Sequence, residues 1–313
     1  MSAGPRTRML LKTTSTARRH AITASYSALT QVCITTADCP EQAELVSEYP
    51  THTWDLPQSN ALAIVHRNLD EAWALIKSAK LLEHHQLLVV TPHYTNVLTA
   101  ACHAITFWHP PGPQRHDPAA SARVTAGVHR IDATTAPWLA EDQHDPFNGL
   151  LDGLDDGPVP DPAKRFLHDQ ASQLRKEWAD IDWPTPTTHI LGARHAARCH
   201  GSRSNPRLFL RQPLLRGHRE WDLVAARWRS DLLLGHLNDN MGYTQTYATH
   251  THTPHNHIGT WPDYQIVRDV IVLTEVMSTV RRAHLDARTR QQADYQIACL
   301  RGAHPRPWNW GRR

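Results

Sequence analysis

Residues 59–85 read SNALAIVHRNLDEAWALIKSAKLLEHH, and this stretch decides the fold class. Its apolar residues recur at alternating steps of three and four, at Leu62, Val65, Leu69, Ala72, Ile76 and Ala79. That spacing places them on one face of an α-helix. Ser59 or Asn60 is suited to cap the first turn, because either side chain accepts a hydrogen bond from a free backbone amide there. We therefore predict one long core-facing helix over this stretch.

Three dipeptides mark further helix starts. Thr91–Pro92, Asp117–Pro118 and Asp161–Pro162 each place a capping side chain before a proline. Proline suits the first helical position because its missing N–H would be unpaired there in any case. After Pro92 the apolar spacing continues through Val97, Ala101, Ala104 and Trp108. Each dipeptide thus predicts a helix that begins at its proline.

Apolar stripes predict three more helices, within residues 17–32, 221–232 and 266–280. Only two short segments, residues 185–192 and 207–210, are candidates for β-strands. The sequence therefore predicts a mainly α protein, a helical bundle of about six to eight helices. Two helical halves joined by an acidic loop are one arrangement of that bundle.

Charge is segregated between two neighbouring regions. From Ile131 to Ala163 there is no Lys or Arg, and residues 148–162, NGLLDGLDDGPVPDP, have the Gly, Pro and Asp content of a linker or long exposed loop. The reverse holds from Trp183 to Arg219, where no Asp or Glu occurs. The arginines of this acid-free stretch are Arg194, Arg198, Arg203, Arg207, Arg211, Arg216 and Arg219.

These patterns divide the chain into five parts. We expect a flexible basic arm, an N-terminal helical half, an acidic linker or loop, a C-terminal helical half and a basic tail that contains tryptophan. Their bounds are residues 1–15, 16–147, 148–162, 163–300 and 301–313.

Composition limits the class of protein. The chain has 313 residues, a formal net charge of +3 and 40% hydrophobic residues, so it can bury a sizeable core and has no strong overall field. Its five cysteines are scattered and form no CxxC pair, which favours a reducing cytoplasm. No apolar run is long enough for a membrane span. The sequence fixes no cofactor, no named partner and no oligomeric state.

Histidine is unusually frequent, with 23 in the chain. Residues 249–257, THTHTPHNH, contain four of them: His250, His252, His255 and His257. Neutral imidazole is a good ligand for divalent transition metals such as zinc, nickel or copper. No carboxylate lies within the run to complete a catalytic site. We expect an exposed connector before the last long helix that binds divalent metal weakly at best.

A second candidate metal site is the pair His168–Asp169 on a predicted helix. The pair resembles the metal-binding dipeptide of HD-type phosphohydrolases, which are all-α proteins. That resemblance implies a metal-activated water that attacks phosphorus. His129 or His144 upstream and Asp222 or Asp231 downstream would complete such a site.

The acid-free stretch is a candidate nucleic-acid interface. Arginine neutralises phosphate, and Trp308 and Trp310 of the tail are suited to stacking on unpaired bases. The candidate contacts are Arg194, Arg198, Arg203, Arg207 and Arg211. In the alternative, the arginines pair with the acidic loop of the same molecule and the indoles dock into a groove.

The sequence contains no Walker loop, GxGxxG fingerprint, GxSxG elbow or HExxH helix. The leading hypothesis is a soluble helical binding or accessory protein that engages a protein or nucleic-acid partner through its Arg-rich surface. The alternative is a metal-dependent phosphohydrolase or nuclease that uses a His/Asp site. Whether the chain is an enzyme stays open at this point.

Overall fold

The computed structural model describes residues 16–36, 42–47, 51–115, 117–139, 144–155, 157–192, 199–201, 206–233, 239–251, 258–284 and 286–310. The chain divides into two compact units. The first comprises Met1–His116 and Arg198–Leu214, and the second comprises Asp117–Ala197 and Leu215–Arg313. Each unit has a hydrophobic core of its own.

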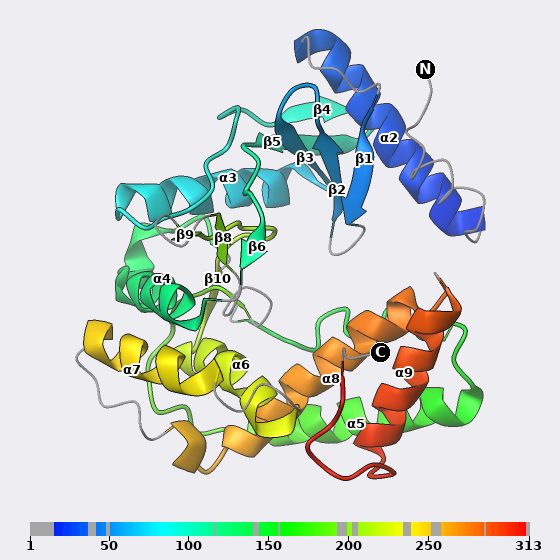
Figure 1. Cartoon of the computed structure of the whole chain (residues 1–313), viewed down its shortest axis with the longest axis vertical. Helices are drawn as coiled ribbons and strands as arrows, with labels where there is room; N and C mark the ends of the chain where they lie inside the picture. Colours follow the sequence, from blue (N-terminus) through cyan, green and yellow to red (C-terminus); the bar gives the residue numbers. More distant parts are fainter. Residues whose placement is uncertain are drawn as a thin grey trace. The chain divides into compact units, whose positions relative to one another are not determined.

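The first unit is built on a five-stranded antiparallel sheet (Figure 1). In spatial order its strands are β1 (Glu44–Ser47), β2 (His52–Leu56), β3 (Ala61–His66), β5 (His103–Trp108) and β4 (Leu98–Ala100). Helix α2 (Thr16–Thr36) packs on one face, where Leu29 and Val32 join the same cluster as Val65 and Phe107. The prediction of a mainly α helical bundle is therefore wrong.

Residues 59–85 form a strand and then a helix, not one helix. All six residues of β3 are buried, and α3 (Leu69–His84) begins after Asn68, whose side chain accepts from Glu71 N. Leu69, expected in the core, is 45% exposed. A strand buried on both faces is a continuous apolar run, and such a run fits the helical period as well as the strand period.

The helix expected after Pro92 is also absent, because β4 and β5 form a hairpin there. Ala101 and Cys102 form its turn, with left-handed φ values of 47° and 62°. Two-residue hairpin turns with two positive φ values usually carry Asn-Gly or a similar pair. Since neither residue here is a usual turn former, no turn motif predicts the hairpin.

Short strands complete both units. In the first, β6 (Gln114–Arg115), β8 (Cys199–Gly201) and β9 (Pro206–Arg207) form a three-stranded sheet. In the second, β7 (Thr188–Ile190) pairs antiparallel with β10 (Leu215–Gly217). Both short segments expected to be β are confirmed in part, since one contains β7 and Arg207 of the other ends β9.

The second unit is mainly helical (Figure 1). Its helices are α4 (Pro118–Arg130), α5 (Asp161–Ala179), α6 (Arg219–Leu232), α7 (Asp239–Thr251), α8 (Tyr264–Arg282) and α9 (Ala287–Leu300), with 3-10 turns at Ala133–Thr135 and Ile258–Thr260. Asp117 caps α4 by accepting from Ala120 N at 2.8 Å, which confirms the predicted start. No helix in the described parts of the chain is both long and apolar enough to span a membrane.

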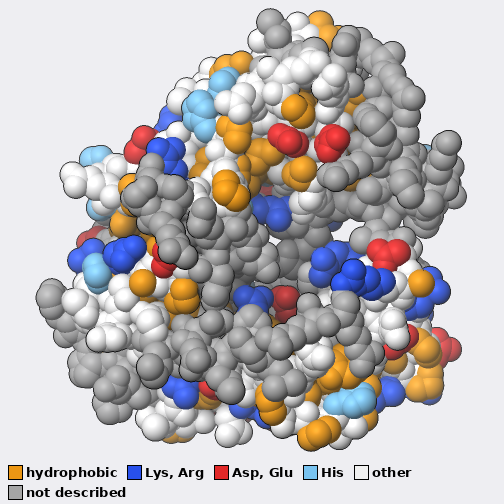
Figure 2. Space-filling view, viewed as in Figure 1, with side chains coloured by type: hydrophobic (Ala, Val, Ile, Leu, Met, Phe, Trp, Pro, Cys, Tyr) orange, Lys and Arg blue, Asp and Glu red, His pale blue; other side chains and the backbone are white. Residues whose placement is uncertain are grey.

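The acidic segment, residues 148–162, lies inside the second unit. Leu150, Leu154 and Val159 of this segment are buried in its core. Figure 2 shows Lys and Arg side chains gathered where α8 ends and α9 begins. One of the arginines of that region, Arg281, donates to the backbone oxygens of Gly149, Leu150 and Asp152. The acidic segment is thus held by its backbone as well as by its apolar side chains.

Candidate functional site

A buried carboxylate organises the polar centre of the second unit. Asp222 lies in the first turn of α6 and is 0% exposed. Its Oδ2 accepts a hydrogen bond from the backbone N–H of Leu191 at 2.7 Å and lies 3.1 Å from Nε2 of His129. Negative charge is favourable at a helix N-terminus, because the unpaired amides and the helix dipole are positive there. Asp222 therefore lies at a position where the helix N-terminus reduces the free-energy penalty of burying its negative charge.

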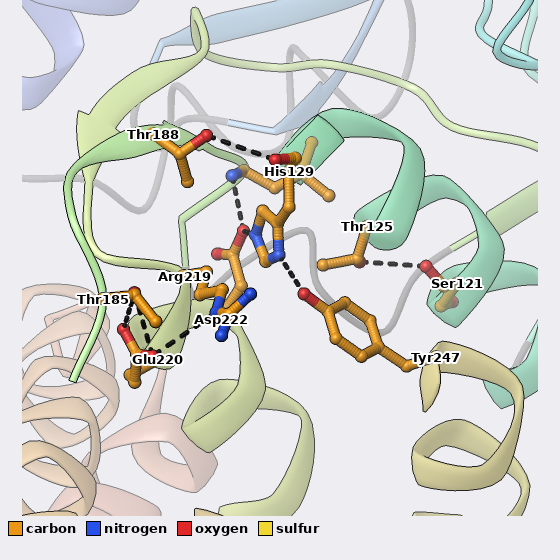
Figure 3. Close-up of polar contacts among 10 residues, drawn as sticks. Ser121, Thr125, His129, Thr185, Thr188, Arg219, Glu220, Asp222 and Tyr247 are labelled. Atoms are coloured by element: carbon orange, nitrogen blue, oxygen red, sulfur yellow. Dashed lines mark hydrogen bonds and ion pairs between the residues drawn. The ribbon is translucent and has the colours of Figure 1, made fainter. Parts of the chain in front are cut away.

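His129 of α4 connects that carboxylate to a tyrosine (Figure 3). A carboxylate only accepts hydrogen bonds, so Nε2 of His129 carries the proton and Nδ1 is free to accept. The hydroxyl of Tyr247 in α7 donates to Nδ1 at 2.6 Å. Burial is the main cause that raises the pKa of Tyr247, so it stays a neutral phenol. The chain of hydrogen bonds thus joins α4, α6 and α7 to the residue that follows β7.

A second carboxylate in the same turn holds an earlier part of the chain. Glu220 is 3% exposed, and the hydroxyl of Thr185 donates to its two oxygens at 2.9 and 2.7 Å. Thr185 and Leu191 lie on either side of β7. The two acids at the start of α6 therefore fix both ends of that strand. Both oxygens of Glu220 and Oδ2 of Asp222 are engaged by the protein, whereas Oδ1 of Asp222 is buried without a hydrogen-bond partner among the described residues.

The first unit contains a different polar centre. His66, the last residue of β3, is 0% exposed, and its Nε2 lies 2.9 Å from Oγ1 of Thr106 on β5. The indole N–H of Trp108 donates to the same oxygen at 2.8 Å. Burial lowers the pKa of His66 to about 4. The histidine is therefore neutral at neutral pH and has only neutral hydrogen-bond partners among these residues.

Of the arginines expected to bind nucleic acid, Arg194, Arg198 and Arg203 lie outside the described residues. Arg207 is exposed at the end of β9, and Arg211 is half-buried in the segment after it. Trp308 and Trp310 are 3% and 8% exposed and stack on each other at 5.0 Å within the core of the second unit. They are therefore not available for stacking on bases.

The candidate metal ligands are not brought together in the described parts of the chain, which contain no group of three or more His, Cys, Asp or Glu residues able to hold a metal ion. His250 ends up in the last turn of α7, where its Nδ1 bonds the carbonyl oxygen of Thr246 at 2.9 Å. His252, His255 and His257 lie outside the described residues.

The pair His168–Asp169 does not join His129 and Asp222, although those two residues do meet. Nε2 of His168 lies 3.0 Å from Oδ1 of Asp155, and Asp169 is exposed on α5. Sequence reasoning named His129 and Asp222 as partners for a metal but missed Tyr247, Thr185 and Leu191. One local signal was available: two acids, Glu220 and Asp222, stand directly after the acid-free stretch.

Comparisons by sequence find no relatives: no protein-family model and no curated protein matches the chain. Solved structures do match. Amicoumacin kinase in complex with AMP-PNP is 10% identical with a TM-score of 0.60, covering 90% of this chain and 96% of that one. A choline/ethanolamine kinase family protein from Mesorhizobium loti is 11% identical with a TM-score of 0.55, covering 88% and 94%. An aminoglycoside phosphotransferase from Streptomyces rimosus is 11% identical with a TM-score of 0.55, covering 78% and 96%.

These matches overturn two of the predictions. A helical binding or accessory protein and a metal-dependent phosphohydrolase or nuclease both assume an all-α chain, whereas the matched proteins combine an antiparallel sheet with helices. At this level of identity the likeness establishes the fold, and the chemistry has to be argued from the residues. The chain has the protein kinase-like fold that small-molecule kinases share.

Proposed function

We propose that this chain is a kinase-fold protein that binds a small polar molecule without transferring a phosphoryl group from ATP. The acid-free stretch carries the proposal, since Trp183 to Arg219 contains no Asp or Glu. Kinases use one Asp of the catalytic loop to accept the proton of the substrate hydroxyl and another, in the D-F-G motif, to hold Mg²⁺. Both motifs follow the sheet and the αC helix in chain order. Here the loop-rich segment after the sheet, from β7 to β10, lies wholly within the acid-free stretch.

The sheet supports the same conclusion. Kinases place a Lys on β3, where it pairs with a Glu of αC and contacts the phosphates of ATP. Strand β3 of this chain reads ALAIVH and has no Lys. Its titratable residue is His66, which is neutral because burial lowers its pKa to about 4. Helix α3 follows β3 and carries Ser78 on its buried face. The Oγ of Ser78 accepts a hydrogen bond from the backbone N–H of Leu214 at 3.0 Å.

Glycine is missing where a phosphate-binding loop would need it. The Gly-rich loop of kinases covers the phosphates because glycine lets the backbone approach them closely. No glycine occurs between Gly4 and Gly112, and all five strands of the first sheet lie within that interval.

The residues present therefore do not fit Mg²⁺ and ATP. Magnesium prefers carboxylate oxygens with free lone pairs. Glu220 and Asp222, at the start of α6, are buried. Both oxygens of Glu220 accept from Thr185 and Oδ2 of Asp222 accepts from Leu191, so of these four oxygens Oδ1 of Asp222 alone has no partner in the described parts of the chain. Support for a small polar ligand comes from the matched proteins, whose names refer to choline or ethanolamine, amicoumacin and aminoglycosides.

Phosphotransferase activity is the second candidate, and one observation favours it. The matches cover 94–96% of the three matched proteins, so most elements of those kinases have a counterpart in this chain. A carboxylate outside the acid-free stretch would then have to accept the proton. Glu220 is the first carboxylate after that stretch.

The two candidates are separated by assaying the full chain with a panel of amino alcohols and aminoglycosides. Melting temperature is measured with each compound alone, and ADP release is measured with each compound in the presence of Mg²⁺ and ATP. We expect at least one compound to raise the melting temperature and none to cause ADP release above the rate without protein.

ADP release that depends on an acceptor would overturn the proposal and support the second candidate. Glu220→Gln keeps the shape of the side chain and removes its charge, and Glu177→Gln on the exposed side of α5 is its matched control. Release that is lost in the first variant alone would identify Glu220 as the catalytic carboxylate. If no compound of the panel shifts the melting temperature, the proposed ligand class is wrong.

A further inference from the structure

Aromatic side chains surround a small pocket in the second unit. It is lined by His144, Trp178, Trp183, Gly217, His218 and Trp221 and has a cavity volume of about 30 Å³. A volume of this size holds about two water molecules, or one small polar group. None of these lining residues is Asp, Glu, Lys or Arg, so the lining offers no Lys or Arg to pair with a phosphate or a carboxylate.

Two ring nitrogens of the lining are buried without a hydrogen-bond partner. They are Nε1 of Trp221, whose residue is 3% exposed, and Nε2 of His144. A buried polar atom without a partner costs about 1–3 kcal/mol, so such atoms are rare in native proteins. Both atoms belong to residues that line this pocket, which therefore offers unsatisfied polar atoms to a molecule bound there.

The third polar group of the pocket has a defined tautomer. Nδ1 of His218 lies 2.7 Å from the backbone oxygen of Thr185, and a carbonyl oxygen only accepts. Nδ1 therefore carries the proton, and Nε2 of the neutral ring is an acceptor. Trp183 stacks on the His218 ring at 4.3 Å with an interplanar angle of 6°, which fixes the orientation of the ring.

Gly217 keeps the pocket from being filled by the chain itself. A Cβ at this position would lie 2.7 Å from Cδ1 of Ile190 and 3.3 Å from Cβ of His144. Any larger residue would therefore push against two residues that line the pocket. The glycine allows β10 to approach β7 and His144 closely while the pocket stays open.

We propose that this pocket binds the carboxamide head group of a small neutral molecule. The indole N–H of Trp221 is a donor for the amide oxygen. The amide nitrogen has two hydrogens. Nε2 of His218 accepts one of them, and Nε2 of His144 accepts the other in the tautomer that carries its proton on Nδ1. The indole and imidazole rings surround the flat amide plane. The inference does not depend on the proposed function, because it rests only on residues of the second unit.

The test measures binding of acetamide to the full chain by saturation-transfer NMR and tryptophan fluorescence. Acetate and tetramethylammonium are the charged comparison probes. Trp221→Phe removes the N–H and keeps a ring, and Trp228→Phe on the same helix is the matched control, because its indole packs against Trp310 instead. We expect saturable acetamide binding that weakens about tenfold, or about 1.4 kcal/mol, in Trp221→Phe and is unchanged in Trp228→Phe.

His144→Phe provides a second variant in case Trp221→Phe fails to fold, since a phenyl ring preserves the edge contact with Trp221 that the imidazole makes at 4.8 Å. It removes one acceptor, so acetamide binding should again weaken. Equal binding by the parent chain and both variants would overturn the proposal. Tighter binding of tetramethylammonium or acetate than of acetamide would also overturn it. If no probe binds, the proposal is overturned as well, and water is then the molecule that occupies the pocket.

Discussion

The two units stabilise a buried histidine in opposite ways. His66 in the sheet is 0% exposed and bonds a neutral threonine hydroxyl, and burial lowers its pKa to about 4. The side chain of His129 in the helical unit is 2% exposed but lies 3.1 Å from the carboxylate of Asp222. A buried histidine ring can bond a neutral hydroxyl or a carboxylate; Thr106 gives His66 the first kind of partner, and Asp222 gives His129 the second.

That difference bears on the proposed function. A kinase needs charged groups on the sheet and in the loops after it, because Lys and Mg²⁺ neutralise the negative charge of the phosphoryl group, and Asp residues hold Mg²⁺ and accept the substrate proton. In this chain the sheet has a neutral interior at His66 and Thr106, and the buried charge of the second unit is used to hold β7 in place. Asp222 thus positions the backbone at Leu191 in the second unit.

The comparison is tested most strongly by Asp222→Ala. This change leaves the N–H of Leu191 and the ring of His129 without their acceptor, and breaking such a buried pair costs about 3–5 kcal/mol. Chemical denaturation should report that loss, and Asp222→Asn should recover part of it because its amide oxygen still accepts from Leu191. Asp294→Ala, at an exposed position of α9, is the control. Equal stability of Asp222→Ala and the parent chain would show that the Asp222 carboxylate does not stabilise this centre.

The pH dependence of stability tests the other histidine. The pKa of His66 is about 4 in the folded chain and near 6.5 in the unfolded chain, so the unfolded state binds the proton first. The contribution of the buried neutral His66 ring to the free energy of unfolding is complete above about pH 6.5. It is lost as pH falls toward 4, and the total loss is about 3 kcal/mol. His66→Phe removes this contribution.

The measurement for His66 is the free energy of unfolding between pH 4 and pH 7. The pKa of His144 is also lowered to about 4, mainly by burial, so the variant should keep part of the slope of the parent chain. Adding His144→Phe to His66→Phe should remove the part of the slope that remains. A slope that is the same in the parent chain and in His66→Phe would mean that the histidine on β3 is not held neutral.

A smaller effect is expected at the other end of the His129 hydrogen bonds. Tyr247→Phe removes the hydroxyl that donates to Nδ1 at 2.6 Å and keeps the ring stacked near Tyr243. One lost hydrogen bond that leaves a buried acceptor costs about 1–2 kcal/mol. Thermal unfolding should therefore show a clear but modest decrease. A decrease as large as that of Asp222→Ala would mean that the tyrosine, and not the carboxylate, anchors this centre.

The helical unit could be predicted from the sequence far better than the sheet could. Helix α5 has one buried face, with Ala163, Leu167, Ala171 and Leu174, and exposed residues between them, so its apolar residues recur with the helical period. Strand β3 is buried on both faces, so no alternation marks it. The hairpin turn at Ala101–Cys102 was invisible because neither residue is a usual turn former.

The candidate site was only partly within reach of the sequence. The acid-free stretch was evident, but its meaning depended on the fold: in a helical protein it predicts a basic surface, and in a kinase fold we propose that it marks the absence of catalytic acids. The contact of His129 with Asp222 joins residues 93 positions apart, and local spacing contains no information about such a pair. The pocket beside Trp221 depends in the same way on side chains from five separate segments.

The smallest expected effect lies at Leu69, where the apolar stripe and the structure disagree. The stripe places this residue in the core, whereas it is 45% exposed at the first position of α3. Leu69→Asp should therefore change the free energy of unfolding by no more than about 0.5 kcal/mol, because an exposed acid in the first turn is favourable to the helix dipole. Leu75→Asp is the matched control on the same helix, and it should unfold the first unit since Leu75 is 0% exposed and an unpaired carboxylate cannot be buried there. Comparable loss of stability in both variants would support the single core-facing helix predicted over residues 59–85. It would contradict the assignment of β3 to the sheet.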